Sequence, residues 1–114
     1  MEIKLIVIRT NKQTQVVDFY SLLGLKFDYH KHGNSPYHYS TTIGNMVLEI
    51  YPLASNQLEP DPYLRLGFTL DNFEETVEQL KSNDVAFSEP IHTDFGFLTV
   101  VTDPDGRKIE LYKK

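Results

Sequence analysis

The chain contains an internal repeat, and this repeat limits the folds that it can adopt. Residues 3–51 have the pattern of a strand, a helix and a β-rich stretch, and residues 64–112 follow the same order. Both copies end in an apolar-Glu-apolar-Tyr sequence, in which Glu49 and Glu110 stand 61 positions apart. Repetition at a long period indicates that one supersecondary unit occurs more than once. We therefore expect two similar modules with a cleft between them.

The first copy begins with a segment rich in β-branched residues at 3–9, which is typical of a strand. Apolar residues at helical spacing follow, between N-cap candidates at 11–14 and a C-cap at Gly24. After this helix we expect a strand at 25–29, a loop at 33–36, and a hairpin of strands 37–42 and 46–51 around Gly44-Asn45.

The second copy follows a stretch at 52–62 that contains three prolines and resembles a linker. Residues 64–70 alternate apolar and other side chains, the pattern of a half-buried strand. A helix capped by Asp71 or Asn72 comes next. We expect further strands at 85–91, 95–102 and 108–112, with a tight turn at Asp103-Pro104-Asp105-Gly106.

These elements predict an α+β fold of two βαβββ modules with curled mixed sheets. Module 1 covers about residues 1–53 and module 2 about residues 63–114 of a single domain, 1–114. Each helix covers the outer face of its sheet, and the other face lines the cleft. Because side chains alternate along a strand, Glu49 and Glu110 are expected on the cleft face. A ferredoxin-like arrangement is the alternative, and the eight expected strands favour the two-module fold.

Composition excludes several classes of function. The net charge of −5 and the pI of about 5.2 argue against a nucleic-acid-binding surface. No apolar run reaches the roughly 18 residues that a membrane-spanning helix needs. The chain has no cysteine, which excludes disulfides and thiolate metal sites. It begins directly in a strand pattern without a signal peptide, and we expect a cytoplasmic protein that contacts neither nucleic acid nor membrane.

Four short motifs, in this order and spacing, resemble the vicinal-oxygen-chelate superfamily. That superfamily includes glyoxalase I, bleomycin-resistance proteins and extradiol dioxygenases. The motifs are Phe19-Tyr20-Ser21-Leu22-Leu23-Gly24-Leu25, Leu48-Glu49-Ile50-Tyr51, Asp103-Pro104-Asp105-Gly106 and Ile109-Glu110-Leu111-Tyr112. The resemblance implies that paired βαβββ modules curl around a pocket and that the chain forms a homodimer.

The resemblance also places metal ligands at four strand positions, the first and last strands of each module. The matching residues here are Leu5, Glu49, Arg65 and Glu110. Leu5 has no donor atom, and the guanidinium of Arg65 cannot lose its proton to become a ligand. We therefore predict no metal and no other cofactor. Arg65 is expected to take the place of the cation by pairing with both carboxylates on the pocket floor.

The candidate catalytic residues are Glu110, Glu49 and Arg65. The aromatic residues Tyr51, Tyr63 and Tyr112 are expected on the same face as these charges. Tyr37 and Tyr39 are expected to share a face, as are Phe95 and Phe97. The alternatives are ordinary exposed strand residues for the charges, and core or dimer-interface residues for the aromatics. The predicted ligand-binding residues are Leu5, Glu49, Tyr51, Arg65, Glu110 and Tyr112.

The histidines offer weaker candidates. His30, His32 and His38 lie within nine residues, and two imidazoles on one strand face can bind zinc or nickel adventitiously. Because the sequence places no acid beside them, we interpret the segment as a solvated hairpin tip. His92 is a candidate general base by its chemistry, but it has no evident partner.

The sequence is compatible with three functions. The first is a metal-free protein that sequesters a small organic ligand in its cleft, similar in architecture to bleomycin-resistance proteins. The second is a glyoxalase-like lyase or isomerase, or a dioxygenase-related enzyme, acting on a small carbonyl, epoxide or aromatic substrate. The third is a non-catalytic interaction module whose own side chains fill the cleft. The sequence does not decide whether the protein is an enzyme.

Overall fold

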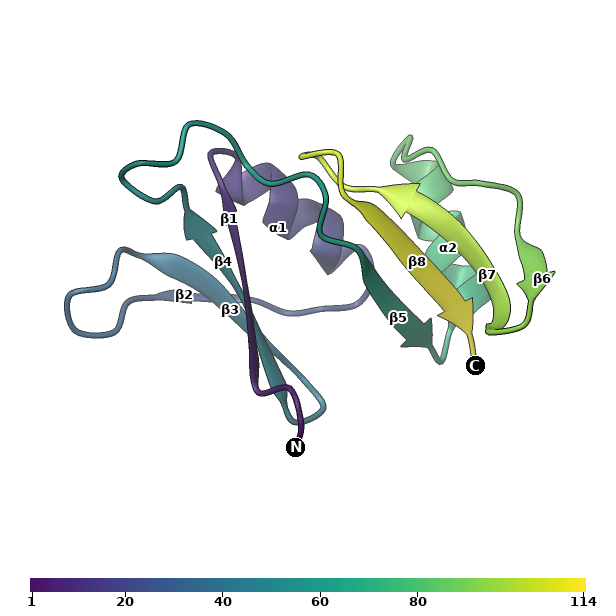
Figure 1. The fold of residues 1–114 in the computed structure, drawn as a ribbon. Helices are drawn as coiled ribbons and strands as arrows, with labels where there is room; N and C mark the ends of the chain where they lie inside the picture. The colour runs from purple at the N-terminus through teal and green to yellow at the C-terminus, as the bar shows by residue number, and fades with distance from the viewer. The chain divides into compact units, whose positions relative to one another are not determined.

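A computed structural model describes all residues from 1 to 114, and it has the predicted α+β order of elements (Figure 1). The chain divides into two compact units, Met1–Asp61 and Pro62–Lys114, and each unit contains one βαβββ module. The division falls inside the stretch that the sequence marked as a linker.

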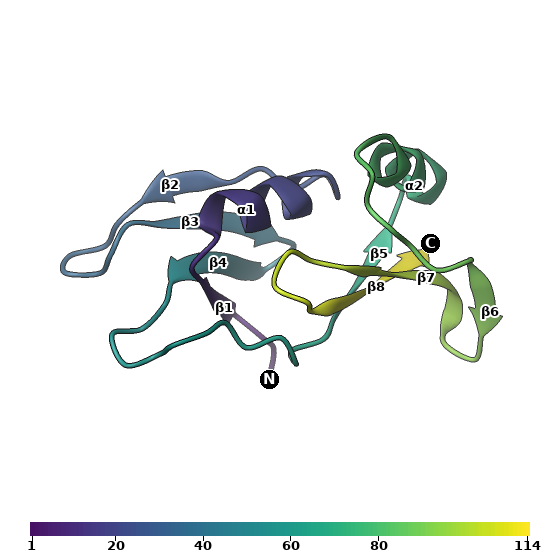
Figure 2. The ribbon, with the colours of Figure 1, turned by 90° about the horizontal axis from the view of Figure 1, so that it is seen from above.

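The first unit contains one four-stranded sheet in the order β1-β4-β3-β2. Strand β1 runs parallel to β4, and the other neighbours are antiparallel. The helix α1 lies over one face of this sheet (Figure 2). The elements are β1 (Leu5–Thr10), α1 (Gln13–Ser21), β2 (Asp28–His30), β3 (His38–Ile43) and β4 (Met46–Pro52).

The second unit repeats this topology with a sheet in the order β5-β8-β7-β6, in which β5 and β8 are the parallel pair. Its elements are β5 (Leu66–Leu70), α2 (Phe73–Ser82), β6 (Ile91–Thr93), β7 (Gly96–Thr102) and β8 (Lys108–Lys113). The two sheets are therefore related by the internal repeat of the sequence.

Each core lies between a helix and one face of its own sheet. In the first unit, Leu48 and Ile50 of β4 are fully buried, as are Val16 and Tyr20 of α1. In the second unit, the corresponding core residues are Ile109 and Leu111 of β8 and Leu80 of α2. Because side chains alternate along β4 and β8, the residues between these apolar ones point to the opposite face, as predicted.

The turn between β7 and β8 is held by a buried ionic cluster. Asp103 accepts hydrogen bonds from the backbone N–H groups of Asp105 and Arg107. The guanidinium of Arg107, which is almost fully buried, donates to Asp103 at 3.1 Å and Asp105 at 2.9 Å. Burial alone would lower the pKa of Arg107, but these bonds to two carboxylates raise it. The predicted turn is therefore a structural element of the second unit.

Several predicted strands differ from the structure, and one of them, expected at 64–70, begins only at Leu66 as β5. Residues 85–91 do not form a strand, because only Phe87 makes an isolated bridge, to Val101, and β6 begins at Ile91. Asp84, which follows α2, has a positive φ of 57°, so the chain leaves the helix through a turn rather than extending at once. Strand β2 begins at Asp28 rather than at residue 25.

Neither helix has the length and apolar character that a membrane-spanning helix requires.

Candidate functional site

The face of the second sheet that points away from α2 carries a three-residue polar group. Glu110 of β8 is paired with Gly67 of β5 and Val100 of β7. Arg65, just before β5, donates through Nη2 to Oε2 of Glu110 at 2.7 Å. The hydroxyl of Tyr112 donates to Oε1 of the same carboxylate at 2.5 Å. Two different donors thus hold the two oxygens of Glu110.

This arrangement changes the acid–base properties of both partners. The hydrogen bond from Tyr112, followed by that from Arg65, holds the pKa of Glu110 below its usual value. The same bond to Glu110 raises the pKa of Tyr112, because loss of the phenol proton would leave two negative charges side by side. Glu110 is therefore an anion and Tyr112 a neutral donor at physiological pH.

Gly67 makes room for this arrangement on the neighbouring strand. A Cβ atom at Gly67 would lie 3.4 Å from a ring carbon of Tyr112 and 3.8 Å from Cβ of Glu110. The absent side chain therefore lets the ring of Tyr112 lie beside β5.

An open depression of about 620 Å³ lies against this group, within the second unit. Its volume falls in the range of small-molecule sites, roughly 300–1,000 Å³. Its walls combine two carboxylates with aromatic and apolar side chains. The lining residues are Thr93, Asp94, Phe95, Leu98, Glu110 and Tyr112.

Two aromatic predictions differ from the structure. Phe95 and Phe97 do not share a face, because Phe95 lines the depression whereas Phe97 packs against Phe73 of α2 with ring centroids 5.7 Å apart. Gly96 lies between them with a φ of 130°, which breaks the alternation of a strand. Tyr63 lies before β5, outside any strand, and is largely exposed.

The corresponding face of the first sheet carries Glu49 and Tyr51 of β4. The strand register places Val7 and Arg9 of β1 beside them. The guanidinium of Arg9 lies over the ring of Tyr51, 4.9 Å from its centroid, and donates to the carbonyl oxygen of Pro52. Leu5, at the start of β1, is on the same face and half exposed.

Tyr37 and Tyr39 belong to an aromatic group with Tyr29 at the β2–β3 edge. The ring of Tyr29 stacks on Tyr37 at a centroid distance of 5.2 Å and contacts Tyr39 at 4.6 Å. Tyr39 is opposite Ile50 in the strand register, so it lies on the helix-covered face rather than beside Glu49.

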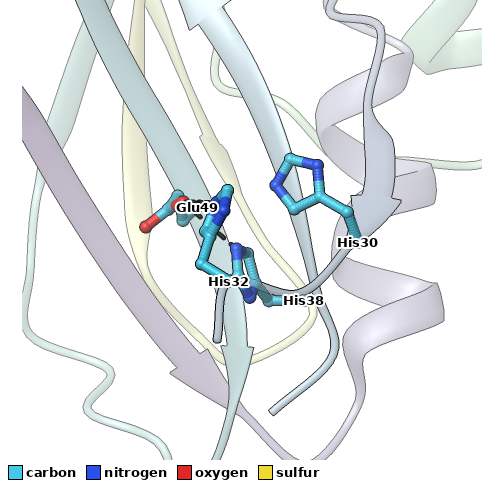
Figure 3. Close-up of side chains that lie close together, drawn as sticks. All are labelled: His30, His32, His38 and Glu49. Atoms are coloured by element: carbon cyan, nitrogen blue, oxygen red, sulfur yellow. Dashed lines mark ion pairs between the residues drawn. The ribbon is translucent and has the colours of Figure 1, made fainter. Parts of the chain in front are cut away.

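The histidines predicted to form a solvated tip gather instead around Glu49 (Figure 3). His30 ends β2, His38 begins β3, and His32 lies in the loop between them. His38 Nε2 lies 3.2 Å from Oε2 of Glu49, and His32 Nε2 lies 3.9 Å from the same oxygen. Only His32 is solvated as expected, with 65% of its side chain exposed, whereas the side chain of His38 is fully buried.

Our sequence-based prediction did not include the acid beside these histidines. Two hairpin registers indicate it. The hairpin around Gly44 aligns β3 with β4, and a second hairpin aligns His30 with His38. Combining the two registers would have placed Glu49 diagonally across from His38. We expected Glu49 on a pocket floor with Arg65 and Glu110. The structure brings Arg65 and Glu110 together and places the histidines of its own unit around Glu49.

Comparisons with known proteins agree with this fold. The model of the Glyoxalase/Bleomycin resistance protein/Dioxygenase superfamily matches residues 2–111. The chain belongs to this superfamily. No curated protein matches the chain in sequence.

Solved structures resemble the whole chain at low identity. TnmS3, an antibiotic binding protein from Streptomyces sp. CB03234, is 21% identical over 99% of this chain and 95% of its own, with a TM-score of 0.80. A superfamily member from Sphaerobacter thermophilus DSM 20745 is 17% identical over 100% and 98%, with a TM-score of 0.77. Lactoylglutathione lyase from Agrobacterium tumefaciens is 13% identical over 98% and 92%, with a TM-score of 0.72. At these identities the likeness shows the fold alone.

The residues at the four metal positions implied by the superfamily do not fit a divalent ion. Leu5 offers no donor atom. Arg65 is a fixed cation that already donates to Glu110 at 2.7 Å, so a second cation on that oxygen would be repelled.

Proposed function

We propose that the protein binds a small organic molecule, without the metal that the superfamily implies at its four strand positions. The observation that carries this proposal is the open depression beside Glu110 and Tyr112 in the second unit. An aromatic and apolar lining with few charges is the usual composition of a small-molecule site. The antibiotic binding protein that shares the fold supports the same class of function.

The charges favour a ligand that carries a positive group. Arg65 neutralises Glu110, which leaves Asp94 as an additional negative charge at the rim. Each carboxylate oxygen has a second lone pair, so Glu110 can accept a further donor from the ligand. Phe95 is highly exposed and offers a ring face on which an aromatic cation can stack. The ligand class is therefore a planar or amphipathic organic cation.

The sequence also predicts Leu5, Glu49 and Tyr51 in the ligand site, and their part in binding stays a prediction. At Glu110 the enzyme alternatives would rely on Arg65 for electrophilic help, because Arg65 is the cation bonded to this carboxylate. Ligand binding needs no electrophile to stabilise a reaction intermediate, so we prefer binding to catalysis.

Binding is tested with a panel of planar aromatic amines and cationic antibiotics, with bleomycin included. At least one member should raise the melting temperature, and its dissociation constant should be measured by calorimetry. Glu110→Gln should weaken that binding by about 10- to 100-fold, because a contact to a charged group contributes about 1.5–3 kcal/mol. Glu78→Gln removes an exposed carboxylate from α2 and serves as the matched control. The proposal fails if no member binds, or if both variants bind equally well.

We also propose that the chain pairs as a homodimer, as the superfamily resemblance implied. Light scattering coupled to size-exclusion chromatography should give twice the mass of 13.2 kDa. A monomer mass at micromolar concentration would contradict this.

A further inference from the structure

We propose that His30, His32, His38 and Glu49 form a binding site for one divalent transition-metal ion of the zinc class. Each residue offers one ligand atom, and the four atoms lie within 4.8 Å of one another. This site uses residues of the first unit alone and shares only Glu49 with the four strand positions discussed above. It departs from the sequence-based expectation of no metal, and it does not depend on the proposed ligand site in the second unit.

The strand register explains why the four side chains meet. His30 is directly opposite His38, and Ser40 is directly opposite Glu49. His38 and Ser40 are two residues apart on one strand, so His38 lies on the same face as Glu49. The loop between β2 and β3 then brings His32 to this face. In Figure 3 the imidazoles of His32 and His38 lie next to Glu49, and the imidazole of His30 lies beyond them.

The hydrogen bonding of His38 selects the tautomer that a metal needs. Its Nδ1 lies 3.0 Å from the carbonyl oxygen of Pro36, and a carbonyl only accepts, so Nδ1 carries the proton in this bond. In the neutral ring, Nε2 then has a free lone pair. Metal-bound histidines commonly donate their other ring N–H to a backbone carbonyl in the same way, which fixes the orientation of the ring.

The free lone pair of His38 is buried without a hydrogen-bond partner. Its Nε2 lies 3.2 Å from Oε2 of Glu49, but the two atoms do not form a hydrogen bond. Nε2 of His30 is also buried and unbonded. A buried polar atom without a partner is costly, and two facing lone pairs repel each other. A cation shared by these atoms would satisfy all of them.

One distance already suits a tetrahedral ion, and the whole cluster, whose ligand atoms lie within 4.8 Å of one another, needs a small contraction to enclose one. Bonds of about 2.0 Å to nitrogen and oxygen place two ligand atoms of one tetrahedron about 3.3 Å apart. The separation of His38 and Glu49, 3.2 Å, already has this value. His32 and Glu49 are 3.9 Å apart, so His32 must move slightly. His32 is in an exposed loop, which allows that movement and gives an ion access to the site.

The ligand types narrow the choice of metal. Imidazole nitrogen suits zinc, copper, nickel and cobalt, whereas calcium and magnesium prefer oxygen ligands. Four protein ligands also complete a tetrahedron, the usual arrangement of a structural zinc site. Bound metal would therefore connect the loop carrying His32 to β4 and stabilise the first unit.

The alternative is an ion pair between Glu49 and a doubly protonated His38, which needs no metal.

The test uses untagged protein that has been treated with a chelator and then titrated with Zn²⁺ by calorimetry. One ion per chain should bind, and the melting temperature should rise. Co²⁺ should give the intense visible absorption of tetrahedral coordination. His32→Ala and Glu49→Gln should each weaken Zn²⁺ binding by at least tenfold, since changes even in residues that support metal ligands cost about 10–100-fold.

His92→Ala is the matched control, because it removes a histidine of the second unit that is outside the cluster. It should leave Zn²⁺ affinity unchanged. Circular dichroism should show that each variant is folded. Because His32 is exposed, His32→Ala is the variant expected to disturb the fold least. The proposal is overturned if the wild-type chain binds no Zn²⁺. It is also overturned if Glu49→Gln binds as tightly as wild type, which would indicate an adventitious histidine pair, or if His92→Ala weakens binding equally.

Discussion

The two modules share one scaffold but surround the same glutamate with different partners. Glu49 and Glu110 occupy equivalent positions in β4 and β8. The antiparallel register of β3 with β4 matches that of β7 with β8. By this match, His38 is equivalent to Leu98 and Tyr51 is equivalent to Tyr112. In the first module, Tyr51 stacks on His38 with ring centroids 4.2 Å apart. In the second, Tyr112 donates its hydroxyl to Glu110.

Two exchanges account for much of this difference: His38 stands where the second module has Leu98, and Leu5 stands where it has Arg65. The ring of His38 offers a flat surface to Tyr51 and a nitrogen to Glu49, whereas Leu98 offers neither. Leu98 instead forms part of the wall of the open depression. The comparison teaches that a repeated glutamate need not repeat its function: one module presents a candidate metal ligand and the other an anion held by an arginine and a tyrosine.

The largest expected effect concerns the turns that connect the last two strands of each module. The first module turns at Gly44 and Asn45, but the second depends on buried Arg107. Arg107→Ala should reduce the free energy of unfolding by about 3–5 kcal/mol, because it leaves two carboxylates uncompensated. Chemical denaturation measures this change. Arg65→Ala breaks an exposed pair and should cost about 1 kcal/mol or less. If both variants lost the same free energy of unfolding, the buried cluster around Arg107 would stabilise the second unit no more than the exposed pair does.

The next effect follows from making the first module resemble the second. His38→Leu should lower Zn²⁺ affinity by at least about 100-fold, because it removes a buried ligand. The chain should remain folded in the presence of a chelator, since leucine occupies the equivalent position at Leu98. Calorimetry and circular dichroism measure the two outcomes. Retained Zn²⁺ affinity in this variant would remove the distinction that we draw between the modules.

The smallest effect concerns the ionisation of Glu110. Its lowered pKa means that the anion persists as pH falls through the usual range for a carboxyl, and is lost only at lower pH. Tyr112→Phe should raise this pKa, because the bond from Tyr112 is the largest cause of the shift. Arg65→Gln should raise it less. Carbon-13 NMR titration of the side-chain carboxyl measures both, and a reversed order would contradict the assignment of causes.

Much of the fold followed from local patterns. The alternation of apolar residues and the repeated Glu-Tyr ending predicted the two βαβββ modules and the faces on which Glu49 and Glu110 lie. Turn residues predicted the bends at Gly44 and at Asp103-Gly106. Residues 85–91 were misjudged because their apolar side chains fit a strand, whereas the partner strand pairs only at Phe87.

The candidate site was harder to predict because it depends on register between strands. The sequence places His30 and His38 apart, and only the pairing of β2 with β3 sets them opposite each other. Likewise, Gly96 has a positive φ, and the residues on its two sides differ in orientation: Phe95 lines the depression, whereas Phe97 packs against α2. The register follows from how the hairpins pair, so it has to be combined from two hairpins before the cluster becomes visible.

The most direct test of the asymmetry between the modules is anomalous diffraction at the zinc absorption edge, from crystals of untagged protein grown with Zn²⁺. We expect one strong peak per chain, at bonding distance from His38 and Glu49, and none at Glu110. A peak at Glu110, or no peak beside the three histidines, would contradict the account.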